Sequence, residues 1–347
     1  MKTSKRLVLL RFSSLGDIAI CVPTIRCFIS KYPGVSITFV TKKNYAPLLN
    51  EFKELEILKL DSNGRHKGLK GLLNLYIDIK ELDPIGVVDL HGSLRSSILS
   101  LFFFFSSIRY KKIHKGRIEK KSLTRKKNKI FVPLTPTINR YCEVFRKMNF
   151  PIDLSDHEFP LKFNTPKKFN NFYFNSKLKW IGIAPFAKHS GKIYPLDLTQ
   201  KVISFLQIEN QVFLLGSEGE EENRLKVWEK AYSNVHVLAG KYSFSDQIKI
   251  ISNLDIMISM DSANGHIATN YNIPVITIWG VTHPYAGFSP WNQNSERSIL
   301  SDRNLYPYIP TSVYGNICPE GYENCMRTIT PEKIIEVVRK TMIQTSS

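Results

Sequence analysis

Strand-like and helix-like segments alternate in both halves of this 347-residue chain, and this feature restricts its fold most strongly. Buried strands are predicted in the first half at residues 6–12, 36–40, 56–60 and 85–90, and in the second half at 179–184, 211–215, 235–238, 255–259 and 274–279. Segments of helical periodicity follow most of them. Such alternation indicates βαβ units and parallel sheets. We therefore expect an α/β chain with two Rossmann-like domains in tandem.

The boundary between the two series is predicted from composition. Residues 153–175 have little apolar periodicity and contain Pro160 and Pro166, which indicates an interdomain connection. We expect domains at 1–172 and 173–329, and a last helix within 330–347. The alternation is interrupted at residues 106–133.

The net charge of +18 is distributed unevenly along the sequence. Residues 1–175 hold 32 Lys and Arg against 14 Asp and Glu, whereas residues 176–347 hold 16 of each. Residues 109–129 alone hold eleven Lys and Arg and one acid, and they follow the apolar run 98–105. An apolar run followed by basic residues is typical of contact with an anionic membrane. The alternative is a core helix followed by a solvated basic loop. Nucleic-acid binding is less favoured, because Tyr110 is the one stacking aromatic in the basic run.

Cysteine usage and hydropathy indicate the compartment. The five cysteines are sparse and odd in number, and the first ten residues lack the apolar core of a signal peptide, so a reducing cytosol is expected. The longest apolar run has about eight residues, whereas a membrane-spanning helix needs about 20. Cys318 and Cys325 lack companion ligands for a zinc site.

Two common nucleotide-binding motifs are absent: no G-x-G-x-x-G follows the first strand, and there is no G-x-x-x-x-G-K-[ST]. A different string, RFSSLGDIAICVP at residues 11–23, joins the first strand to the first helix. It places Asp17 where ligands bind in open α/β sheets, outside the carboxyl end of a strand. Asp17 is either a general base for a hydroxyl group or a carboxylate stabilised by the helix dipole.

Two further strings follow strands of the second half. APFAKHSGKIYP at residues 184–195 carries Lys188 and Lys192, which either hold a phosphate or lie exposed on the surface. LLGSEGEEE at residues 214–222 offers acids for ribose hydroxyl groups, or a solvated first helical turn.

The string ISMDSANGHIA at residues 258–268 places Asp261 and Ser262 at a strand end. His266 follows four residues after Ser262, on the same helical face. A Ser-His-Asp hydrolase is conceivable from the residue types, but G-x-S-x-G is absent and the three residues are local in sequence. A buried structural histidine is the other interpretation.

Together these strings resemble glycosyltransferase family 9, the bacterial lipopolysaccharide heptosyltransferases. The matching strings are RFSSLGDIAICVPTIRCFISKYP, VVDLHGSLRSS, IGIAPFAKHSGKIYPL and MDSANGHIATNYNIPVITIWGVTHP, in family order. The resemblance implies a GT-B fold, in which two Rossmann-like domains with parallel sheets face a central cleft. The N-terminal domain would bind the acceptor and the C-terminal domain the nucleotide-sugar. The final helix would pack back on the N-terminal domain.

The resemblance also implies an activity: inverting transfer of heptose from ADP-heptose to a hydroxyl group of the lipid A-linked lipopolysaccharide inner core. It implies neither a cofactor nor an essential metal. The enzyme would act in the cytoplasm as a peripheral protein of the inner membrane. Its basic N-terminal half is expected to contact the membrane surface, and no nucleic acid is expected as a partner. One alternative is a GT-B transferase that uses another nucleotide-sugar. The other is a non-catalytic nucleotide- or RNA-binding protein.

Site roles follow from the same resemblance. Asp17 matches the family's catalytic base, and Lys192 its phosphate lysine. Glu218 is the best match to the ribose acid, with Glu220 as a rival. The remaining expected donor residues are Lys188, Asp261, Ser262 and His266, and the expected acceptor residues are Ser14, Gly16 and Arg95. Lys188 and Ala263 depart from the usual pattern, which has Ser or Thr and Gly at these positions.

Overall fold

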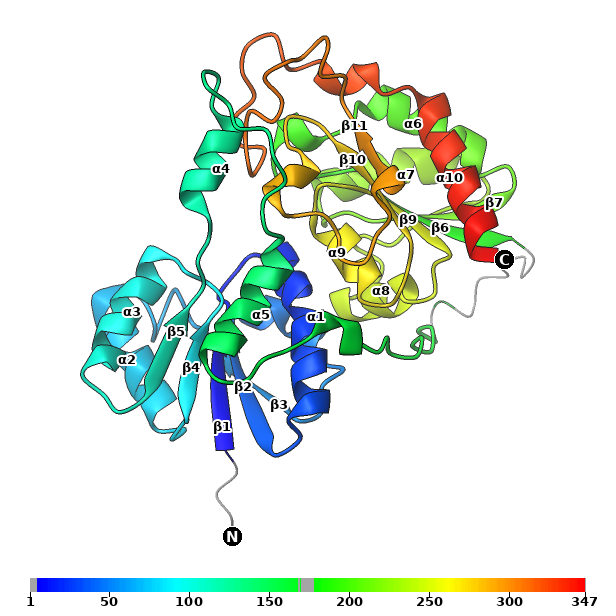
Figure 1. Ribbon diagram of the computed structural model, residues 1–347. Helices are drawn as coiled ribbons and strands as arrows, with labels where there is room; N and C mark the ends of the chain where they lie inside the picture. The colour runs from blue at the N-terminus through cyan, green and yellow to red at the C-terminus, as the bar shows by residue number, and fades with distance from the viewer. Residues whose placement is uncertain (1–4, 168, 170–177, 347) are drawn as a thin grey trace. The chain divides into compact units, whose positions relative to one another are not determined.

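The chain divides into two units, each built on its own parallel sheet (Figure 1). The computed structural model describes residues 5–167, 169 and 178–346. Unit 1 comprises Met1–Lys115 and Thr137–Glu158, and unit 2 comprises Gly116–Pro136 and Phe159–Ser347. The chain therefore passes from one unit to the other three times.

The sheet of unit 1 has five parallel strands in the order β3-β2-β1-β4-β5. The strands are β1 (Lys5–Leu10), β2 (Val35–Thr41), β3 (Leu55–Lys59), β4 (Gly86–Asp89) and β5 (Arg109–Lys112). The central position of β1 follows from its buried apolar run, because a strand covered on both faces needs no polar side. Leu10 pairs with both Val40 and Asp89, so these three strands end together.

Helices cover both faces of this sheet. The helices are α1 (Leu15–Lys31), α2 (Gly68–Lys80), α3 (Leu94–Phe104) and α5 (Thr137–Lys147). Val8 and Leu10 of β1 pack in one cluster with residues of α2 and α3, including Leu75 and Phe103. Helices α1 and α5 contact each other, and they lie over the sheet in Figure 1.

The sheet of unit 2 has six parallel strands in the order β11-β10-β9-β6-β7-β8. The strands are β6 (Lys179–Ala184), β7 (Asn210–Leu214), β8 (Val235–Val237), β9 (Ile256–Met260), β10 (Val275–Trp279) and β11 (Ser298–Leu300). The helices are α4 (Arg117–Thr124), α6 (Leu196–Leu206), α7 (Glu220–Ala231), α8 (Phe244–Ile251), α9 (Ala263–Thr269) and α10 (Pro331–Ser346). The predicted parallel sheets are confirmed, whereas the short edge strands β5 and β11 were not predicted.

The observed units differ from the expected domain boundaries. The expected division between residues 172 and 173 lies outside the described residues. The final helix α10 packs against α6, and its Ile334, Val337 and Val338 join the apolar core of unit 2. The apolar face that α10 presents to this core accounts for this packing, and the expected packing of the final helix on the N-terminal domain stays a prediction.

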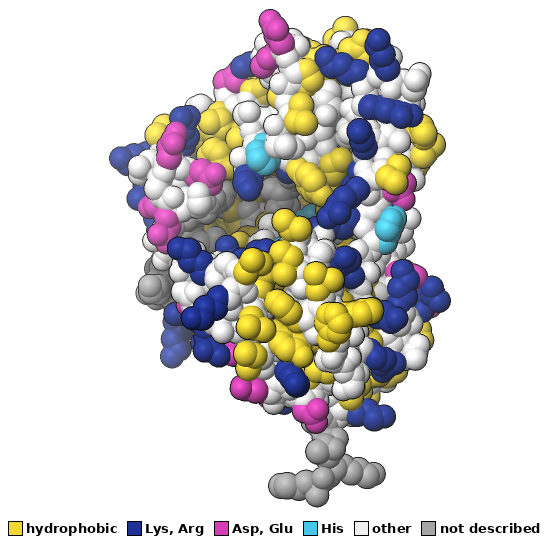
Figure 2. Space-filling view, turned by 90° about the vertical axis from the view of Figure 1, so that its left-hand side faces the viewer, with side chains coloured by type: hydrophobic (Ala, Val, Ile, Leu, Met, Phe, Trp, Pro, Cys, Tyr) yellow, Lys and Arg dark blue, Asp and Glu magenta, His cyan; other side chains and the backbone are white. Residues whose placement is uncertain are grey.

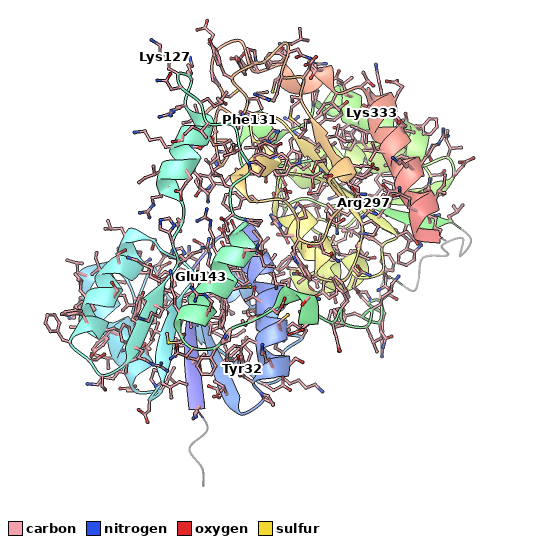
Figure 3. The ribbon with its side chains drawn as sticks, in the orientation of Figure 1. Tyr32, Lys127, Phe131, Glu143, Arg297 and Lys333 are labelled. Atoms are coloured by element: carbon pink, nitrogen blue, oxygen red, sulfur yellow. The ribbon has the colours of Figure 1, made fainter. Side chains whose placement is uncertain are left out.

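The basic segment 109–129 is also divided between the units. Its β5 part completes the sheet of unit 1, whereas α4 and the following loop belong to unit 2. In that loop, Lys129 Nζ donates to the carbonyl oxygens of Tyr308 and Pro310, both at 2.6 Å. The Arg303 guanidinium carbon lies 3.6 Å from the ring centre of Phe131, which is labelled in Figure 3.

The spatial division changes the distribution of charge. Unit 1 holds 22 Lys and Arg against 13 Asp and Glu, and unit 2 holds 26 against 17, so each carries +9. The basic excess of residues 1–175 is therefore shared between the two units. Among the helices of the described residues, none is both long and apolar enough to cross a bilayer.

Candidate functional site

Asp17 lies in the first turn of α1, just beyond the carboxyl end of β1. Ser14 precedes the helix, and its backbone N–H and hydroxyl group donate to Asp17 Oδ2 at 3.2 and 2.7 Å. This is a capping arrangement, which the S-x-x-D spacing produces locally. The Asp17 side chain retains 22% exposure, so a ligand can reach it.

Arg11 holds the same carboxylate from the other side. Its side chain is buried, its Nη2 forms an ion pair with Asp17 Oδ2, and its Nη1 donates to the Leu90 carbonyl oxygen at 2.7 Å. Burial alone would raise the pKa of Asp17, but the Arg11 charge and the Ser14 hydrogen bonds outweigh it and hold that pKa below its usual value. Asp17 is therefore an ionised carboxylate at neutral pH.

Helix α5 contacts the backbone of the first turn of α1, which carries Asp17. Tyr141 of α5 donates its hydroxyl group to the Asp17 carbonyl oxygen at 3.3 Å, and Cys21 Sγ contacts the same oxygen at 3.2 Å. Burial raises the pKa of the Cys21 thiol to about 12, so this residue is a neutral packing group. The turn that carries Asp17 is thus supported by α1 and α5.

His91 lies beside this turn and was not among the predicted site residues. It follows β4, where Asp89 Oδ1 accepts from the backbone N–H groups of His91 and Gly92 at 2.8 and 2.9 Å. Its ring packs on Phe12, with 4.8 Å between ring centres. Burial, then the charges of Arg11 and Lys115, lower the pKa of His91 to about 3, so the imidazole is neutral. The feature of the sequence that could have identified His91 is the string DLHG, which lies at the end of a buried strand.

Of the other residues predicted for this part of the site, Ser14 and Gly16 lie in the Asp17 turn. Arg95 is in the first turn of α3; its Nη2 donates to the His66 carbonyl oxygen at 2.8 Å, and its guanidinium lies 5.9 Å from the Phe12 ring centre. Asp17, His91 and Arg95 therefore all adjoin the carboxyl ends of β1 and β4, as the sheet register requires.

Lys192 ends the short 3-10 turn η3 (Ser190–Lys192) that follows β6 in unit 2. Its Nζ donates to the Asp261 carbonyl oxygen at 2.6 Å and lies 3.4 Å from Asp261 Oδ2. The two side chains are only 13% and 9% exposed. The predicted phosphate lysine and the first residue of the D-S-x-x-x-H string thus form one mostly buried ion pair.

Glycines make the close packing around Lys192 possible. The Val281 N–H donates to the Gly191 carbonyl oxygen at 3.0 Å, and a Cβ added at Gly280 would lie 2.2 Å from that oxygen. Gly315 has φ of +80°, and a Cβ there would lie 2.4 Å from Lys192 Cγ. Two loops that are distant in sequence therefore enclose the Lys192 stem.

The rest of the predicted string lies at the start of α9. Ser262 precedes the helix, and its Oγ lies 3.1 Å from Ser259 Oγ. His266 is buried within α9. Asp261 thus contacts Lys192, and Ser262 contacts Ser259.

Lys188 and Glu218 are both exposed. Burial, then the charges of Lys192 and Lys188, lower the pKa of His189, so both lysines contribute to the potential of one loop. Glu218 precedes α7. Its rival Glu220 pairs with Arg224 at 3.0 Å, and Glu221 Oε2 accepts from the Ser217 N–H and hydroxyl group at 2.7 and 2.8 Å.

Comparisons with known proteins identify similar sequences and solved structures of similar fold. The chain is 25% identical to the lipopolysaccharide core heptosyltransferase OpsX of Haemophilus influenzae, over 97% of this chain and 96% of that protein. A glycosyl transferase family 9 structure from Veillonella parvula superposes with a TM-score of 0.75 at 14% identity, covering 98% of each chain. The E. coli ADP-heptose lps heptosyltransferase II superposes with a TM-score of 0.68 at 18% identity, covering 99% of this chain and all of that one.

The family assignment rests on the sequence itself. The model of the family described as glycosyltransferase family 9 (heptosyltransferase) matches residues 85–310, which is well over half of the chain. The match includes Lys192 and the D-S-x-x-x-H string, and the two parallel sheets are those of a GT-B fold. The chain belongs to glycosyltransferase family 9, the heptosyltransferases, and is a glycosyltransferase.

Proposed function

We propose that this enzyme transfers heptose from ADP-heptose to a hydroxyl group of the lipopolysaccharide inner core, with inversion at the anomeric carbon. The observation that carries the proposal is the ionised Asp17, held by Arg11 and Ser14 at the end of β1 in a family 9 chain. Support for the substrates comes from relatives named as a lipopolysaccharide core heptosyltransferase and an ADP-heptose lps heptosyltransferase.

In the proposed reaction, Asp17 takes the proton of the acceptor hydroxyl group. The contacts described above involve Oδ2, which leaves Oδ1 to receive that proton. As the proton moves, the acceptor oxygen bonds to the anomeric carbon, and the bond from that carbon to the ADP phosphate oxygen breaks on the opposite face. The electron pair of the broken bond leaves with ADP. The neutral His91 adds no positive charge that would compete for the Asp17 carboxylate.

The Lys192 region is the proposed donor site. The Lys192 ammonium is positioned by Asp261, and its remaining N–H is available to a diphosphate oxygen. It would stabilise the negative charge that develops on departing ADP. Lys188, Ser262 and His266 are the proposed further donor contacts, and Glu218 the proposed partner of the ribose hydroxyl groups.

The acceptor is proposed to lie against unit 1. Ser14 and Gly16 border the Asp17 carboxylate, and Arg95 supplies a cation for an anionic group on the core saccharide. Arg95 donates one N–H to the His66 carbonyl oxygen, so its guanidinium has further N–H donors for this contact.

Because that acceptor is lipid-linked, we place the enzyme in the cytoplasm, peripheral to the inner membrane. The net charge of +18 supports attraction to anionic lipids. The expected basic N-terminal half contributes less than the sequence suggests, since each unit carries +9.

The proposal is tested by incubating the purified chain with ADP-, UDP- and GDP-sugars, with and without a heptose-deficient lipopolysaccharide acceptor. We expect release of ADP from ADP-heptose that depends on the acceptor, and a product of greater mass by one heptose. Acceptor-dependent release of UDP or GDP instead would assign a different donor, and no release with any donor would refute catalysis of this kind.

A further inference from the structure

The outer surfaces of α2 and α3 expose an unusual set of large apolar side chains. Six of them, between 41% and 88% exposed, form what is here named the apolar platform: Leu69, Leu73, Ile77, Leu101, Phe104 and Phe105, the last of which directly follows α3. The two helices contact each other, with Tyr76 of α2 against Phe103 of α3 at 5.0 Å between ring centres. Figure 2 faces this side of the molecule and shows hydrophobic side chains gathered over it.

The platform is additional to the core-facing side of these helices. Leu72, Leu75 and Ile79 already bury one face of α2, and Leu99 and Phe103 bury one face of α3. Leu69, Leu73 and Ile77 are spaced by four residues and form a second apolar stripe on α2. A surface helix usually presents polar residues there, so a second exposed apolar face indicates a surface that becomes covered.

Basic residues border the platform. Lys67 and Lys70 are exposed at the start of α2, and Lys112 of β5 reaches over α3, where its Nζ donates to Ser97 Oγ at 3.2 Å. Residues 65–112 hold eight Lys and Arg against four Asp and Glu. Among the acids, Asp78 pairs with Arg65 and His66, whereas Glu81 lies exposed at the end of α2.

We propose that the apolar platform inserts into the headgroup layer of an anionic bilayer, with Phe104 and Phe105 deepest and the bordering cations on lipid phosphates. The proposal deepens the proposed function and rests on its lipid-linked acceptor. An apolar face bordered by Lys and Arg has the chemistry of interfacial binding, in which apolar burial and attraction to anionic lipid act together. It also moves the membrane contact from the basic segment 109–129 as a whole to α2, α3 and β5.

The test is cosedimentation of the full chain with phosphatidylethanolamine–phosphatidylglycerol vesicles and with neutral phosphatidylcholine vesicles. The test variant is Phe104→Ser with Phe105→Ser, which removes two exposed rings and no core contact of the unit 1 cluster. The matched control is Leu161→Ser, an exposed apolar residue of unit 2 at 91%. We expect the double variant to bind anionic vesicles at least about tenfold more weakly, because two rings lose their apolar burial, and the control to bind like the wild type.

Unchanged vesicle binding of the double variant would overturn the proposal. So would equal wild-type binding to neutral and anionic vesicles, or a wild-type dimer in sedimentation that the double variant abolishes, since the platform would then cover a second copy of the chain. Transfer to a delipidated core saccharide is measured in parallel and is expected to be the same in all three proteins. If the wild type binds anionic vesicles through the platform but transfers no heptose, the proposed function fails while the membrane contact stands.

Discussion

The Arg11 guanidinium contacts both the Asp17 carboxylate and the Leu90 carbonyl oxygen, so one buried cation links the ends of β1 and β4 to the proposed base. The charge of Asp17 is thereby balanced inside unit 1. Together with the Ser14 hydrogen bonds, this contact keeps the carboxylate ionised and fixes its position within unit 1.

Replacing Asp17 by Asn removes the proton acceptor and nearly preserves the shape of the side chain. We expect kcat to fall by about 10³-fold or more, because general-base assistance is lost and the amide can still occupy the capping position. Binding of ADP, measured by calorimetry, is expected to stay within a factor of two or three of wild type, roughly the scatter of surface substitutions. Asp153→Asn, which alters a capping carboxylate elsewhere in unit 1, is the control. Retained turnover in Asp17→Asn would contradict the assigned role.

Replacing Arg11 by Gln should shift the pH dependence of the reaction. The folded-state pKa of Asp17 is depressed, so the ionised form persists to lower pH than in the unfolded chain. Without the Arg11 charge that pKa rises, and the acid limb of kcat/KM against pH moves to higher pH. The stability that the depressed pKa provides is present above the unfolded-state pKa and is lost as pH falls through the folded-state value, so acid unfolding should depend less on pH in the variant. Arg11→Lys keeps the positive charge, so its acid limb should lie between those of the wild type and Arg11→Gln. If the acid limb of Arg11→Gln does not move, a group other than Asp17 controls it.

Replacing Lys192 by Met tests the donor site. ADP binding is expected to weaken by about tenfold or more, because a charge-assisted phosphate contact is lost. The variant also leaves Asp261 mostly buried and unpaired, which should cost about 2 kcal/mol of unfolding free energy. Adding Asp261→Asn should recover stability but not ADP affinity. Lys201→Met, at an exposed position of α6, is the control, and full ADP affinity in Lys192→Met would exclude the phosphate role.

We expect that the Lys192 side chain can keep its position only if residue 315 is a glycine. Gly315→Ala places a methyl group against Lys192 Cγ at a positive φ, so we expect a loss of about 1–3 kcal/mol in stability and weaker ADP binding. Gly34→Ala is the matched control, since no described atom lies within 4 Å of the added Cβ and its φ is not positive. Thermal melts and ADP titrations measure both effects, and equal behaviour of the two variants would refute the packing argument.

Much of the fold and of the Asp17 region was predictable because the signals are local. A buried apolar run, a small-residue turn and an acid at the third helical position identify the end of β1 within one string. The roles of Arg11 and His91 were not predicted. Arg11 binds an oxygen 79 residues away, and the pKa of His91 depends on burial and on Lys115, which local spacing does not reveal.

The basic segment was the least predictable part of the fold. Its helix α4 has mostly polar residues and no periodic apolar run, and β5 consists of Arg109, Tyr110 and two lysines. Their placement is determined by partners distant in sequence, such as the Tyr308 and Pro310 carbonyl oxygens that bind Lys129. From its charge, this segment was expected to contact a membrane or to form a solvated basic loop, whereas Lys129 in the structure is held by two backbone carbonyl oxygens of unit 2.

The membership of residues 116–136 in unit 2 has a consequence for biosynthesis. Unit 1 has all of its residues once position 158 has left the ribosome, but residues 116–136 then still await Tyr308 and Arg303, which are synthesised much later. During that interval Phe131 and Lys129 lack their final partners. A polypeptide cut at the midpoint of the sequence would retain this loop with the wrong half, so the two units are best studied in one continuous chain.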